Sequence, residues 1–175
     1  MTGTSIFLGY DRETLREQVD LLAAGRRLDE LENQRSLAAL TEKLALYRMV
    51  GRIDEAWLMA NETVRQARFT GDRETLLAAR IRRAQIQQYQ GKLEIALMEL
   101  SGCVDEAHTH DWALLEASAL EHRGKSYFDK GDYRRALVDL EDAHALRERE
   151  NVSAAQLEAT SVGISVIREK IASNG

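Results

Sequence analysis

The residues best suited to chemistry in this sequence are a cysteine and two histidines that lie close together in the chain. Cys103, His108 and His110 suggest a metal site, because thiolate and imidazole are preferred zinc ligands. Their spacings place Cys103 and His108 on different faces of a helix, whereas His110 falls in a predicted loop. A structural zinc site also needs four converging ligands. We therefore expect no metal and no other cofactor.

Cys103 and a third histidine, His122, also have interpretations that involve no chemistry. A nucleophilic cysteine needs an exposed, electropositive setting, but Cys103 stands 40 residues before Ala143, at a position where the sequence keeps small side chains. Buried packing is therefore its predicted role. His122 offers a way to tune partner binding with pH, and a plain surface histidine is the alternative.

The acidic residues do not form a recognisable catalytic pair. Segments such as LDELE and DLEDA carry carboxylates at helical surface spacing with Arg and Lys nearby, a pattern typical of solvated, ion-paired faces. The sequence contains no phosphate-binding loop, dinucleotide fingerprint or nucleophile elbow. We expect that the protein is not an enzyme.

The composition favours a helical protein that functions in the cytoplasm. The net charge is −5, with both signs interspersed, so no basic patch favours nucleic acid. The single cysteine suits a reducing compartment, and no apolar run approaches the roughly 18 residues of a membrane-spanning helix. There is no proline, and Ala, Leu, Glu and Arg are abundant, which favours an all-α fold.

A repeat of 40 residues organises the chain. A frame with glycine first, a hydrophobic residue third and alanine sixth occurs at 51–56, 91–96 and 131–136. The glycine suits the left-handed conformation that ends a helix, and the alanine lets the following helix pack closely on its neighbour. Each copy therefore predicts two helices joined by a tight turn.

The most complete copy, GKSYFDKGDYRRALVDLEDA at 124–143, resembles a tetratricopeptide repeat (TPR), in the long-period variety found in bacterial signalling and regulatory proteins. HEAT and armadillo repeats have a similar period but do not explain the glycine-to-alanine frame. The resemblance implies an all-α, right-handed superhelix of about three helical hairpins with a capping helix at each end. Within one domain, 1–175, we expect an N-terminal helical segment at 11–36, repeats at 37–71, 72–110 and 111–150, and a C-terminal cap at 151–175.

The turn signals predict the individual helices. Expected helices span 11–24, 28–50, 53–69, 73–90, 93–109, 112–130, 133–149 and 153–171. Gly25 is expected to end the first of them. Asp72 and Asp111 are expected to cap the helices that follow, and Asn151 or Ser153 to cap the last.

The TPR resemblance further implies that the first helix of each pair lines a concave groove for an extended peptide or a partner helix. Carried over by register, that surface includes Ala38, Thr41, Ala45, Ala78 and Asp129. The residues predicted to bind the partner are Arg48, Gln85, Gln88, Tyr89, Glu121, Lys125 and Phe128. Tyr89 and Phe128 would be apolar anchors and the others polar readers. For the glutamines around Tyr89, a solvated helix end is an equal alternative.

The expected function is therefore a scaffold that binds a protein or peptide, in bacterial regulation or complex assembly. The alternative is a self-assembling homodimer whose groove binds no outside ligand. Neither nucleic acid nor a membrane is an expected partner.

Two further patterns leave alternatives open. Lys43, Arg83 and Arg123 stand 40 residues apart, and they either read an acidic partner or bridge neighbouring helices through residues such as Glu42 or Glu121. Arg80 and Gln87 occupy positions that are apolar in other copies. Either their helix turns to bury other residues, or it leaves a polar notch in the groove.

Overall fold

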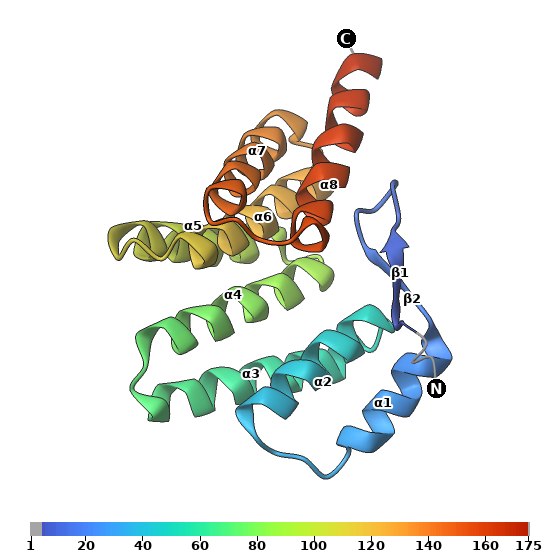
Figure 1. The fold of residues 1–175 in the computed structure, drawn as a ribbon, viewed down its shortest axis with the longest axis vertical. Coiled ribbons are helices and arrows are strands. Elements are labelled where there is room, and N and C mark those ends of the chain that lie inside the picture. Colours follow the sequence, from blue (N-terminus) through green and yellow to red (C-terminus); the bar gives the residue numbers. More distant parts are fainter. Residues whose placement is uncertain (1–4, 175) are drawn as a thin grey trace.

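The computed structural model describes residues 5–174, and helices packed in chain order make up most of it (Figure 1). The first elements are the strands β1 (Phe7–Tyr10) and β2 (Glu17–Val19), followed by the helices α1 (Leu21–Leu31), α2 (Leu37–Met49), α3 (Ile53–Thr70), α4 (Arg73–Tyr89), α5 (Leu93–Thr109), α6 (Ala113–Lys130), α7 (Tyr133–Arg149) and α8 (Ala154–Ser173). The pairs α2/α3, α4/α5 and α6/α7 form three helical hairpins between α1 and α8. The predicted all-α solenoid is confirmed.

The repeated glycines close the first helix of each pair as predicted. Gly51, Gly91 and Gly131 have φ angles of 80°, 73° and 82°, in the left-handed region. After each glycine the next amide donates back across the turn; the Asp132 amide, for example, donates to the Tyr127 carbonyl at 2.9 Å. This bond satisfies a carbonyl that the end of the helix leaves free, so each glycine fixes one sharp reversal.

The turns between the hairpins use different signals. Asp72 caps α4 as predicted, because its carboxylate accepts from the Glu74 amide at 3.1 Å. The prediction for Asp111 is wrong: this residue takes a left-handed φ of 57° just after α5, and Trp112 precedes α6 without a side-chain cap bond. Of the two predicted caps for the last helix, Ser153 is the one used, in a capping box with Gln156.

Small side chains allow the helices of a pair to approach closely. Ala56, Ala96 and Ala136 are completely buried. At Gly124 an added Cβ would lie 3.1 Å from the Ala136 carbonyl oxygen, so α6 and α7 are in contact through their backbones there. The alanine of each frame therefore packs as predicted.

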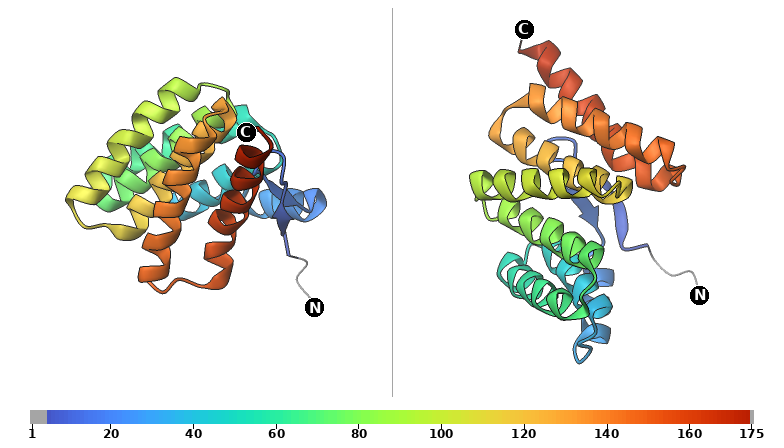
Figure 2. Two further views of the ribbon diagram at one scale, coloured as in Figure 1. Left: turned by 90° about the horizontal axis from the view of Figure 1, so that it is seen from above. Right: turned by 90° about the vertical axis from the view of Figure 1, so that its left-hand side faces the viewer.

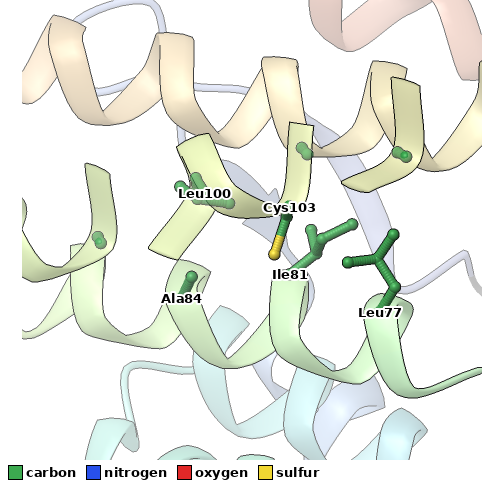
Figure 3. Close-up of a cluster of buried hydrophobic side chains, with 8 residues drawn as sticks. Leu77, Ile81, Ala84, Leu100 and Cys103 are labelled. Carbon is green, nitrogen blue, oxygen red and sulfur yellow. The ribbon is translucent and has the colours of Figure 1, made fainter. Parts of the chain in front are cut away.

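Cys103 belongs to the hydrophobic core between α4 and α5. It is fully buried with Leu77, Ile81, Ala84 and Leu100, and Figure 3 shows its sulfur directed toward α4. Burial raises the pKa of the thiol to about 12, so the thiolate is disfavoured. The packing role predicted for this residue is confirmed.

The first helices of the three helix pairs also contact one another. Helix α4 contacts both α2 and α6, and α6 contacts α8 (Figure 2). We call α2, α4, α6 and α8 the inner row. None of the helices described combines the length and apolar character needed to cross a bilayer.

The N-terminal region differs from the prediction of a helix at 11–24. Asp11 does act as a cap, because its carboxylate accepts from the amides of Glu13 and Thr14 at 2.9 and 2.8 Å. Only a single turn follows, since Leu15 adopts a left-handed φ of 56°. The chain then returns as β2, antiparallel to β1, with an irregularity between Phe7 and Gly9.

The helices that follow this sheet are also shifted from their predicted positions. Helix α1 begins after Asp20, whose carboxylate accepts from the Leu22 and Ala23 amides, and Gly25 lies inside α1 instead of ending it. The predicted helix at 28–50 is interrupted, because α1 ends at Leu31 and Ser36 caps a separate α2.

Two glycines provide a matched test of the turn geometry. Gly131→Ala places a Cβ in the left-handed region and should lower the free energy of unfolding by roughly 1–2 kcal/mol. Gly102→Ala, in the exposed middle of α5 where nothing lies near the new Cβ, should raise it by about 0.5–1 kcal/mol. Urea unfolding followed by circular dichroism measures both changes. Equal effects of the two substitutions would contradict the assigned turn.

Candidate functional site

The N-terminal residues 7–19, here called the hairpin, lie across the C-terminal ends of α2, α4 and α6 and beside α8 (Figure 1). We define the hairpin-binding surface by the inner-row side chains that contact the hairpin through charged or aromatic groups: Arg48, Tyr89, Lys125, Asp129 and Glu169. Four helices of the solenoid therefore hold an extended segment of the same chain.

The shortest charged contact with α2 joins Glu17 of the hairpin to Arg48. Both terminal nitrogens of Arg48 donate to the carboxylate, at 2.7 and 2.9 Å, and Arg48 also donates to the Tyr89 hydroxyl at 2.9 Å. Arg48 is only 6% exposed, so its charge needs a counter-charge. Burial opposes ionisation of Glu17, but the bonds and charge of Arg48 outweigh it and lower the pKa of Glu17 to about 2.

The neighbouring residue, Arg16, carries the opposite charge to Glu17 and binds an acidic residue of the solenoid. Its guanidinium lies 4.1 Å from the centre of the Tyr89 ring and donates to the Asp129 carboxylate at 2.5 Å. The same carboxylate oxygen accepts from the Gln88 amide at 2.8 Å. Tyr89 therefore lies between the two charges of the hairpin, contacting Arg16 with its ring and Glu17 with its hydroxyl.

A third group of charges lies around Tyr10. The Lys125 ammonium is 5.6 Å from the Tyr10 ring and donates to Glu121 at 2.6 Å, while Arg147 contacts the other Glu121 oxygen at 2.6 Å. Burial would raise the pKa of Glu121, but Lys125 and its other cationic neighbours hold it well below its usual range. Burial also raises the pKa of Tyr10 to about 12.

His122 lies among these charges and not on an open surface. Burial lowers its pKa to about 4, and its Nδ1 atom has no hydrogen-bond partner within residues 5–174. This low pKa favours the neutral imidazole near pH 7, and a role of His122 in tuning partner binding with pH stays a prediction.

Apolar contacts of the hairpin are concentrated at Leu15. This side chain is 2% exposed and belongs to the cluster that contains Phe128, Val166 and Ile167. Nearby, Arg12 contacts Glu169 at 2.7 Å, but both side chains are more than half exposed, so this ion pair adds little stability.

The seven residues predicted to bind a partner do lie together on the inner row, but they do not form an open groove. All of them except Tyr89, which is partly buried, have exposed fractions between 2% and 7%: Arg48, Gln85, Gln88, Glu121, Lys125 and Phe128. The hairpin contacts Arg48, Tyr89 and Lys125. Phe128 packs in the core against Tyr133. The glutamines are not a solvated helix end.

Sequence reasoning missed the hairpin residues Arg16 and Glu17. Residues 6–10, Ile-Phe-Leu-Gly-Tyr, are rich in β-branched and aromatic side chains, which is a strand signal. This signal would have indicated an extended N-terminus. It would not have identified the surface that the hairpin contacts.

Part of the predicted groove stays uncovered. A hollow of about 580 Å³ lies between α2 and α4, and its lining includes Ala38, Thr41, Ala45 and Ala78 of the predicted surface. Arg82 also lines it and makes no hydrogen bond or ion pair with the residues described. Burial lowers the pKa of Arg82, and no carboxylate offsets that effect.

The three basic residues spaced 40 apart, Lys43, Arg83 and Arg123, connect neighbouring elements, although not through the expected acids. Lys43 donates to the backbone carbonyls of Glu32 and Gln34 at 2.9 and 2.8 Å. Arg123 forms a bidentate pair with Asp139 at 2.7 and 2.8 Å. The third member, Arg83, is 3.7 Å from Glu99.

The polar positions in α4 have a similar explanation. Arg80 donates to Glu99 and Glu106 of α5 at 2.9 and 2.6 Å, while Leu77 and Ile81 of the same helix are buried. Helix α4 therefore buries other residues and pairs Arg80 with α5, so this position is not an unfilled notch.

Comparison with known proteins bears on the fold alone. No family model matches this sequence, and no curated protein does. Among solved structures, the crystal structure of BtubC (BKLC) from P. vanneervenii is similar, with a TM-score of 0.62 and 18% sequence identity. The match covers 86% of this chain and 65% of that one, so this chain spans less than two thirds of BtubC. Within residues 5–174, no group of three His, Cys, Asp or Glu residues is placed to hold a metal ion.

The Glu17–Arg48 pair predicts a loss of stability in acid. Because the folded pKa of Glu17, about 2, lies below its ordinary value of 4.5, its contribution is complete above pH 4.5 and declines as the pH falls toward 2. Between pH 7 and pH 3, urea unfolding should show a loss of roughly 2 kcal/mol that the Glu17→Gln variant lacks. The other titrating groups are present in both proteins, so the difference between them reports Glu17 together with its effect on the pKa of His122. Identical pH profiles would contradict the buried pair.

Proposed function

We propose that this chain is a protein-interaction module of the TPR type, without enzymatic activity, whose inner row binds an extended segment of a partner protein. One observation carries the proposal: the hairpin-binding surface holds an extended segment already, from the same chain, through Arg48, Tyr89 and Asp129. A surface that contacts both charges and an aromatic ring of one segment has the chemistry needed to recognise another.

The rigidity of the surface supports the same proposal. Its five contact residues come from four packed helices, α2, α4, α6 and α8, and Arg48 and Lys125 are held by hydrogen bonds. A preformed surface of this kind loses little conformational entropy when a peptide binds. The strongly shifted carboxylates, Glu17 and Glu121, are paired with cations, an arrangement that favours a structural role over catalysis.

We place this module in the cytoplasm, in bacterial regulation or complex assembly. The single cysteine is buried and free, which suits a reducing compartment. The regulatory setting rests on the resemblance of the 40-residue repeat to long-period TPR proteins.

Selection from a random 12-residue peptide display library on the full-length protein tests this proposal. Selected peptides should bind an Ala78→Glu variant at least tenfold more weakly, because the new carboxylate enters the uncovered hollow of the inner row. Met98→Glu, which places the same charge on an exposed position of α5, is the matched control and should bind normally. Equal loss in both variants, or selection of no peptide, would refute the proposal.

A homodimer is the second candidate function, and one observation favours it. Phe7 and Leu8 in β1 and Leu21 and Leu22 in the first turn of α1 are exposed apolar side chains, and the pairing of Phe7 with Val19 brings these two segments together. Exposed apolar groups that cluster often mark an interface.

The dimer has its own test. If two copies pair through these residues, sedimentation velocity of the wild type should show a concentration-dependent dimer that a Leu21→Ser, Leu22→Ser variant lacks. A Leu58→Ser variant, at an exposed position of α3, is the control and should behave as the wild type does. A wild type that stays monomeric at all concentrations would exclude the dimer.

A further inference from the structure

The hairpin is attached to the solenoid mainly by charged groups and a single buried apolar side chain. Leu15 is its one buried hydrophobic residue among 7–19, and Phe7 and Leu8 are exposed. Tyr10, Arg12, Arg16 and Glu17 add ion pairs and ring contacts. Segments with few buried apolar contacts open at a small fraction of the cost of global unfolding.

Once detached, the hairpin has little to keep it folded. It consists of two short strands, and an isolated two-stranded hairpin is marginally stable at best in water. Detachment therefore leaves a flexible segment and an exposed hairpin-binding surface at the same time.

Polar groups in and next to the hairpin-binding surface stay unpaired while the hairpin is bound; Gln88 adjoins Asp129, and His122 lies near Lys125 and Arg48. Arg48 Nε, Gln88 Oε1 and His122 Nδ1 are buried atoms without a hydrogen-bond partner among the residues described. Buried groups of this kind favour any ligand that supplies the missing bonds. A segment with the same charges and one or two additional polar groups would bind this surface better than the hairpin does.

We infer that the hairpin is an internal ligand, and that the partner is a protein segment that presents the same leucine-arginine-glutamate chemistry in extended form and takes its place. This inference rests on the proposed function and names the partner for that surface. The leucine would enter the cluster of Phe128 and Ile167, the arginine would pair with Asp129, and the glutamate would pair with Arg48. While docked, the hairpin would compete with the partner, so its undocking regulates binding.

The chain's own segment serves as the probe. A fluorescein-labelled peptide of residues 5–20 is titrated against the full-length wild type and against a full-length Arg16→Ala, Glu17→Gln variant, with fluorescence anisotropy as the readout. The variant should bind the peptide at least tenfold more tightly, because its own hairpin no longer occupies the surface. A Glu13→Gln, Gln18→Ala variant changes two exposed hairpin residues and should bind as the wild type does.

Two further measurements locate the binding. We call the Arg16→Ala, Glu17→Gln protein the loosened protein. A peptide that itself carries Arg16→Ala and Glu17→Gln should bind it at least tenfold more weakly than the unchanged peptide does. Adding Arg48→Met to the loosened protein should have the same effect, and circular dichroism checks that it folds. If Arg48→Met fails to fold, Asp129→Asn replaces it, because it removes the partner of the peptide arginine.

The results separate this inference from the proposed function. Equal peptide affinity of the loosened and wild-type proteins, or no effect of Arg48→Met and Asp129→Asn, would overturn the internal ligand. In that case, library peptides that still depend on Ala78 would leave the proposed function intact. Failure of both experiments would reject the inner row as a binding surface.

Discussion

The buried guanidinium of Arg48 determines how the N-terminal part of this protein is arranged. A cation removed from water is strongly destabilising unless a counter-charge and hydrogen bonds replace its hydration. Glu17 supplies both in a bidentate pair, and the position of that carboxylate fixes the register in which the hairpin crosses α2. The hydroxyl of Tyr89 accepts a further hydrogen bond from Arg48, and the Tyr89 ring lies under Arg16.

The repeated part of the fold follows closely from the sequence, because local chemistry determines it. A left-handed glycine, a buried alanine and a helix of strong helix formers depend on neighbours a few residues away. Helices α3 to α7 consequently begin and end within a residue of their predicted bounds. Asp111 is an exception, since its left-handed backbone follows α5 where a cap for α6 was expected.

The N-terminal region could not be predicted in the same way, because its structure depends on distant contacts. The cap at Asp11 is a real helix-start signal, yet the chain leaves the helical path at Leu15, whose side chain is buried beside α8. Arg16 and its partner Asp129 are separated by 113 residues. Most residues that contact the hairpin are assigned to the groove by register with the TPR pattern, but Glu169 is not, and the segment that covers them belongs to no repeat and was missed.

The hairpin contacts both ends of the inner row, since Glu17 binds Arg48 of α2 and Leu15 packs with Ile167 of α8. In an ordinary solenoid each repeat contacts only its neighbours, so the small rotations between repeats add up and set the curvature of the array. The hairpin contacts the first and last helices of the inner row and therefore turns this open series of interfaces into a closed ring. The curvature of the inner row therefore depends on the contacts of the hairpin with α2 and α8 as well as on the packing between neighbouring helices.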